Sequence, residues 1–174
     1  MFTLWGKHEE LKKLTRIPRS NRNLQTPAFV GVGEDLYLSY YVESYDKNWL
    51  GDLSVNPTQA INHVPHVILH FRQLAFYSST KYQDDTLTLH PMYSKGLRPF
   101  GQFEVLNSLK IAQIRESFDA SISEQQALPD ELRHFIFSIH GHVIEIICHD
   151  FAIHKETGAV FSSIENLIQG RSAK

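Results

Sequence analysis

"HFIFSIHGHVIEIICHDFAIH", residues 134–154, holds five of the ten histidines of the chain and its only cysteine. Apolar and polar residues alternate on both sides of Gly141, as in half-buried strands. A glycine between two such runs predicts a two-residue turn, built on either His140–Gly141 or Gly141–His142. We therefore expect a β-hairpin that joins 134–139 to about 143–151, with the choice of turn left open.

Both turns sort the side chains onto the same two faces, because they differ by two residues of pairing. The alternation predicts one apolar face in the core, formed by Phe135, Phe137, Ile139, Ile144, Ile146 and Cys148. The opposite face is expected to be more polar and carries His134, Ile136, Ser138, His140, Val143, Glu145, Ile147 and His149.

Outside the hairpin, the chain reads mainly as strands, expected at 35–43, 66–77, 86–90 and 100–106. In 66–77 the alternation turns Val67, Leu69 and Phe71 inward and His66, Ile68, His70 and Arg72 outward. Asn107 is expected to cap a helix at about 108–118, and a short helix is expected near the C-terminus. The predicted class is α+β, a single globular domain over 1–174 with a mainly antiparallel sheet, either open or curled like a barrel.

Composition and charge limit the partners. The 174 residues are 42% hydrophobic and 21% charged, an ordinary globular balance, and the net charge of −2 gives no reason to expect nucleic acid. No run approaches the roughly 18 to 20 apolar residues of a membrane helix, and no signal peptide is recognised, so we expect a cytoplasmic protein without a membrane partner. A basic N-terminal arm at about 1–26 is expected to fold back on the acidic body.

The histidines of the hairpin do not predict a metal site. With a Gly141–His142 turn, His134 faces His149 and Ser138 faces Glu145, but about 13 Å separates these pairs at roughly 3.3 Å per residue. Because zinc needs three or four ligands, we expect neither metal nor cofactor, and a third ligand from His66, His70 or His90 is the alternative left open. Cys148 lies on the apolar face, where a thiol is inert.

The loop that follows residue 89 carries a second set of polar residues. His90, Tyr93, Lys95 and Arg98 stand among prolines and glycines that fix the backbone, and these four are our candidates for binding a small anion or a carboxylate of a protein partner. The alternative is an ordered connection in which Tyr93 and Phe100 only fill the end of the sheet.

The stretches "HPMYSKGLRPFGQFEVLNS" (90–108) and "RHFIFSIHG" (133–141) resemble an uncharacterised family of small bacterial proteins with the pattern HPxYxxGL, EVxNS and RHxxFxxH. The resemblance covers about 65–155. It implies a bacterial source and no particular activity. It groups as one candidate site His90, Tyr93, Arg98, Glu104, Asn107, His134 and His140.

Two functions remain open at this stage, and the sequence does not decide whether the chain is an enzyme. The one we favour is a non-catalytic binding or interaction protein that recognises a small anionic ligand or a protein partner through the 90–98 loop. The alternative is a hydrolase, metal-assisted or not, in which His134, His140 or His149 acts as general base and Glu145 orients it. Exposed strand edges would also permit a homodimer.

Overall fold

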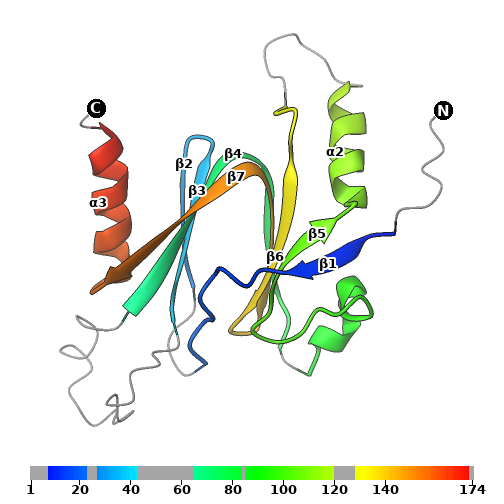
Figure 1. Cartoon of the computed structure of the whole chain (residues 1–174), viewed down its shortest axis with the longest axis horizontal. Coiled ribbons are helices and arrows are strands. Elements are labelled where there is room, and N and C mark those ends of the chain that lie inside the picture. The colour runs from blue at the N-terminus through cyan, green and yellow to red at the C-terminus, as the bar shows by residue number, and fades with distance from the viewer. Residues whose placement is uncertain (1–7, 23–26, 43–64, 84, 120–127, 173–174) are drawn as a thin grey trace. The chain divides into compact units, whose positions relative to one another are not determined.

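The structure, a computed structural model, describes residues 8–22, 27–42, 65–83, 85–119 and 128–172 (Figure 1). The helices and strands in this part of the chain are, in order, β1 (Glu10–Lys13), β2 (Ala28–Val32), β3 (Asp35–Tyr41), β4 (Pro65–Lys81), the 3-10 helices η2 (Leu87–Leu89) and η3 (Pro91–Tyr93), β5 (Gln102–Leu106), α2 (Leu109–Asp119), β6 (Arg133–Ile139), β7 (His142–Thr157) and α3 (Val160–Ser172).

The strands hydrogen-bond in the linear order β1-β5-β6-β7-β4-β3-β2. The pairs β1–β5, β5–β6, β6–β7, β3–β4 and β2–β3 are antiparallel. The predicted α+β class with a mainly antiparallel sheet is therefore confirmed, and so are the helix at about 108–118 and the helix near the C-terminus. Because β1 and β2 end the order, the described strands form an open sheet and not a closed barrel.

The chain divides into two compact units. The first consists of residues 1–15 and 73–150, and the second of residues 16–72 and 151–174. The first unit contains β1, β5, α2, β6 and the loop between β4 and β5. The second contains β2, β3 and α3, and the long strands β4 and β7 contribute residues to both.

The hairpin between β6 and β7 forms with the His140–Gly141 turn. Ile139 pairs with His142, and the two residues between them have φ angles of 48° and 72°. Positive φ at both central positions defines a type I′ turn, whose twist matches that of the flanking strands. Phe135 lies opposite Ile146, as the predicted sorting of faces requires, and the six residues predicted for the apolar face are each at most 1% exposed.

The opposite face of the hairpin is also buried, which the sequence did not predict. Ile136 and Val143 pack there against Leu87 and Leu97, two buried residues of the segment between β4 and β5. The alternation of polar and apolar residues suggested a half-exposed face, but a loop of small 3-10 helices covers it and turns it into a second core. Ionisable residues on this face are therefore partly or fully withdrawn from water.

The predicted strand at 86–90 is wrong, because this segment forms η2. The Thr86 hydroxyl donates to Gln83 O (3.1 Å), and the Leu87 N–H donates to the same oxygen (2.8 Å). Side-chain hydrogen bonds of this kind favour tight turns over strands, and Pro91 then opens η3 at its first position. Five alternating residues were too short a pattern to outweigh these local contacts.

In the second unit, α3 covers a face of β3 and β4. Val160 and Ile164 pack against Tyr37 and Ile68. The prediction that the side of β4 with His66, Ile68 and His70 faces outward is therefore wrong, because all three side chains are buried. None of the helices in the described part of the chain combines the length and apolar character needed to cross a membrane.

Of the predicted N-terminal arm, the structure describes residues 8–22, while 1–7 and 23–26 lie outside the described residues. The described part is ordered along β1, which pairs with β5 through Glu10–Lys13. Further along, Ile17, Ser20 and Asn21 are buried. This segment therefore contributes an edge strand, and it carries Glu9 to the site described next.

Candidate active site at the start of α2

The junction between β5 and α2 is a sharp turn. Asn107, the residue after β5, has a φ of 54°, a left-handed conformation that Asn tolerates better than most residues. Ser108 follows, and its Oγ accepts a hydrogen bond from the N–H of Ile111 (3.2 Å). Ser108 is therefore the N-cap of α2 in place of the predicted Asn107, whose side chain donates instead to His8 O (3.2 Å).

Ser108 also contacts His134, a residue of β6 whose side chain is 2% exposed. Ser108 Oγ and His134 Nδ1 are 2.8 Å apart. The direction of this bond depends on the tautomer of His134. The carboxylate of Glu145 lies on the Nε2 side and favours a ring proton there, and Nδ1 then accepts from the Ser108 hydroxyl. In this neutral tautomer the ring proton of His134 is on Nε2, on the side of Glu145.

Glu145 lies diagonally across from His134, because the observed turn sets Glu145 opposite Ile136. Glu145 Oε2 is 3.7 Å from His134 Nε2, within the range of an ion pair but longer than a hydrogen bond. Lys110, in the first turn of α2, donates to the same carboxylate oxygen. The carboxylate of Glu145 thus lies between His134 of β6 and the positively charged Lys110 of α2.

His90 completes the surroundings of Glu145. Its Nδ1 accepts the N–H of Met92 (3.1 Å), so its proton is on Nε2, which is 3.5 Å from Glu145 Oε1. Contacts from His134 and His90, with the charge of Lys110, hold the pKa of Glu145 far below its usual range, although burial acts in the opposite direction. Glu145 is therefore ionised near neutral pH and can orient a base and stabilise its protonated form.

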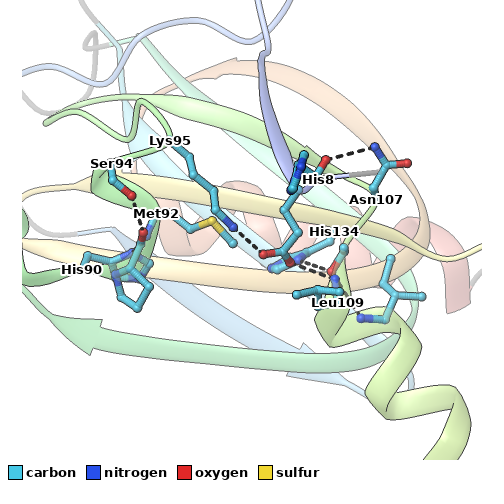
Figure 2. A network of polar contacts seen from close by, with 12 residues as sticks. His8, His90, Met92, Ser94, Lys95, Asn107, Leu109 and His134 are labelled. Atoms are coloured by element: carbon cyan, nitrogen blue, oxygen red, sulfur yellow. Dashed lines mark hydrogen bonds and ion pairs between the residues drawn. The ribbon is translucent and has the colours of Figure 1, made fainter. Parts of the chain in front are cut away.

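A second carboxylate meets the start of α2 from the other side. Glu9, the residue before β1, accepts the N–H of Leu109 with Oε1 (2.8 Å) and pairs with Lys95 Nζ through Oε2 (2.6 Å). Figure 2 shows the Lys95 side chain extending from its loop toward Leu109 and His134. Burial raises the pKa of Glu9, but the hydrogen bonds from Lys95 and Leu109 outweigh it and leave that pKa below its usual value.

The predicted residues divide into two groups. His90, His134 and Glu145 converge in one cluster, and Lys95 joins its edge through Glu9. Arg98 faces its own loop, where its guanidinium donates to Tyr93 O (3.0 Å) and Leu97 O (2.7 Å) and lies over the Tyr93 ring.

The other two histidines proposed as bases lie elsewhere on the hairpin. His140, in the turn, packs its ring edge against Phe100 at 5.8 Å between centroids. His149 Nδ1 is 3.0 Å from Glu131 O. Within the described residues, neither has a contact that joins it to Glu145. No group of three His, Cys, Asp or Glu side chains in these residues is arranged to hold a metal ion.

The sequence interpretation missed Ser108, Lys110 and Glu9. Ser108 could have been noticed, because a serine placed directly between a predicted strand and a predicted helix is the arrangement of a hydrolase nucleophile on a strand–turn–helix elbow. The glycines of the usual elbow signature are missing here, and Asn107 supplies the left-handed residue instead. Glu9 had no local signal, because its role depends on pairing across roughly a hundred residues.

No family model, curated protein or solved structure gives a match to this chain. The resemblance to a small bacterial family therefore stays a prediction.

Acid should weaken the fold through these two carboxylates. Because folding lowers their pKa values, their stabilising effect is complete above the unfolded value of about 4.5 and is lost as the pH falls through the folded value. We expect the free energy of unfolding, measured with urea, to fall below pH 4.5 in the wild type and to fall less steeply in Glu145→Gln. Glu10→Gln, at an exposed position, should keep the wild-type slope. Parallel curves for the wild type and Glu145→Gln would contradict the expected role of Glu145.

Proposed function

We propose that the chain is a hydrolase that cleaves acyl esters, with Ser108 as nucleophile, His134 as general base and Glu145 as the residue that orients His134. The observation that supports this most directly is the 2.8 Å contact between Ser108 Oγ and His134 Nδ1. Nucleophile, base and orienting carboxylate then follow one another in the order of an acyl-transfer triad, with an ion-pair distance of 3.7 Å between His134 Nε2 and Glu145 Oε2.

In the proposed reaction, Ser108 Oγ attacks the carbonyl carbon of the ester while its proton passes to His134 Nδ1. The imidazolium gives this proton to the departing alcohol as the ester C–O bond breaks. Water then attacks the Ser108 ester by the same route, which releases a carboxylate and restores Ser108. Throughout, the negative charge of Glu145 stabilises the protonated form of His134.

His90 and Lys110 would act through Glu145 and not on the substrate. His90 faces one carboxylate oxygen and Lys110 the other, so the carboxylate has little freedom to rotate. This arrangement would hold Glu145 ionised and directed at His134 Nε2. Both are therefore proposed as positioning residues.

A fluorophosphonate probe tests the proposal, because it forms a stable bond only with an activated serine. We expect mass spectrometry to find one adduct, at Ser108, and none in Ser108→Ala. Ser94, an exposed serine whose hydroxyl donates to Pro91 O, serves as the internal control and should stay unmodified. Adducts spread over several serines would contradict the hydrolase. So would the absence of an adduct at Ser108 both in the wild type and in Glu9→Ala, a variant that removes the carboxylate bound to the Leu109 N–H.

The binding function favoured from the sequence is the second candidate. It is supported by the way Lys95 and the Leu109 N–H together hold a carboxylate, that of Glu9. A carboxylate or phosphate ligand held there without any modification of Ser108 would favour binding over catalysis. The bacterial source, the cytoplasmic location, the single domain and the homodimer expected from the sequence are also proposals.

A further inference from the structure

The carboxylate of Glu9 occupies a position that matters for the proposed reaction. In hydrolases built on a strand–turn–helix elbow, the backbone N–H of the residue after the nucleophile helps to bind the oxyanion. Here that residue is Leu109, and its N–H donates to Glu9 Oε1 at 2.8 Å. The donor that would stabilise the acyl oxygen is therefore already in use.

The surroundings of Glu9 suit a carboxylate in particular. Lys95 Nζ meets the second oxygen at 2.6 Å, and the Glu9 side chain is only 8% exposed. A carboxylate is also what ester hydrolysis leaves beside Ser108. The Glu9 carboxylate thus has the charge and shape of the reaction product, and it accepts from the two donors, Leu109 N–H and Lys95 Nζ, that such a product could use.

Glu9 lies just outside the paired part of a short edge strand. It precedes β1, which pairs through four residues with β5 and stands at the end of the strand order. Glu9 contacts Lys95 and the Leu109 N–H, and the backbone oxygen of His8 accepts from the Asn107 side chain. Releasing these contacts would leave the pairing of Glu10–Lys13 intact.

We propose that Glu9 is a built-in occupant of the acyl subsite: its carboxylate blocks the Leu109 N–H and Lys95 in the resting chain, and a substrate acyl group or a product carboxylate binds there once Glu9 moves away. This inference rests on the proposed hydrolase. In this proposal Lys95 selects the substrate: it favours esters whose acyl group, once hydrolysed, has its carboxylate within reach of Lys95 Nζ.

Acetate tests the subsite without any need for catalysis. We compare the wild type, Glu9→Ala and Glu10→Ala, which removes the same charge from the exposed neighbouring position, in sodium acetate against sodium chloride of equal ionic strength. Acetate should raise the unfolding midpoint of Glu9→Ala and shift its Leu109 amide resonance, because a ligand that binds only the native state stabilises it. The wild type and Glu10→Ala should not respond, and adding Lys95→Ala to Glu9→Ala should abolish the response. An equal response in all variants, or none in Glu9→Ala, would overturn the subsite.

The rate of fluorophosphonate labelling separates this inference from the proposed function. If Glu9 blocks the site, the probe should label Ser108 at least about tenfold faster in Glu9→Ala than in the wild type. The reason is that the state with a free Leu109 N–H is a minor one in the wild type and the main one in the variant. Equal rates would overturn the blocking role and leave the hydrolase standing. An acetate response without any adduct at Ser108 would overturn the hydrolase and support the carboxylate subsite.

Discussion

We expect Ser108→Ala to lower kcat/KM for p-nitrophenyl acetate by on the order of a thousandfold, because the variant has no hydroxyl to form the acyl intermediate. His134→Gln should lose a similar factor, since the proton of Ser108 then has no basic nitrogen to accept it. The double variant should be no slower than either single one, because residues that act as a unit are not additive. Initial rates, corrected for the rate without protein, measure all three.

Because Ser108 also caps α2, the control must separate the cap from the nucleophile. Ser108→Asn keeps a good N-cap and removes the nucleophile, so it should unfold like the wild type and be as inactive as Ser108→Ala. His149→Ala is the matched control for His134, since His149 is on the same hairpin but contacts Glu131 O. If His149→Ala lost as much activity as His134→Gln, or Ser108→Asn stayed active, the assigned roles would be wrong.

The hairpin could be predicted because its signal is local. Alternation over residues 134–149 fixes which side chains share a face, and Gly141 fixes the place of the turn. The choice between the two turns could not be predicted, since both contain Gly141. It depends on His140 accepting a φ of 48°, a small cost that the surrounding structure decides.

The choice of turn decides which candidate base lies beside Glu145, a point that the sequence left open among His134, His140 and His149. The alternative turn would place Glu145 opposite Ser138, while the observed one places it opposite Ile136 and beside His134. A shift of two residues moves the carboxylate by about 6.6 Å along the strand, enough to separate it from the base. Sequence reasoning also had no way to bring Lys110 and His90 to Glu145, because α2 and the loop before β5 reach this face only through tertiary packing.

The ligand candidates of the loop show the same limit. Lys95 and Arg98 were grouped because both are cations held on one ordered loop. In the structure Lys95 pairs with Glu9, whereas Arg98 donates to carbonyl oxygens of its own loop. Composition identified the charges, but only the packing of β1 beside β5 decides which of them lies near the start of α2.

Truncating either face of β6 should destabilise the fold strongly. Phe137 is fully buried on the face predicted as core, and Phe137→Ala should lower the free energy of unfolding by about 3–5 kcal/mol. Ile136 is fully buried on the opposite face, against Leu87 and Leu97, so Ile136→Ala should cost about 2–5 kcal/mol. Urea unfolding at neutral pH measures both.

Ile136 is the more informative of the two positions, because the sequence alone suggested a half-exposed face there. Truncating an exposed isoleucine would lower the free energy of unfolding by only about 0.5 kcal/mol. A small effect of Ile136→Ala would therefore mean that the loop with η2 and η3 does not cover this face. Ile136→Val, the matched control, removes one methyl group and should cost about 0.5–1.5 kcal/mol. A large effect of Ile136→Ala with a small one of Ile136→Val would support the second core, and with it the burial that withdraws His134 and Glu145 from water.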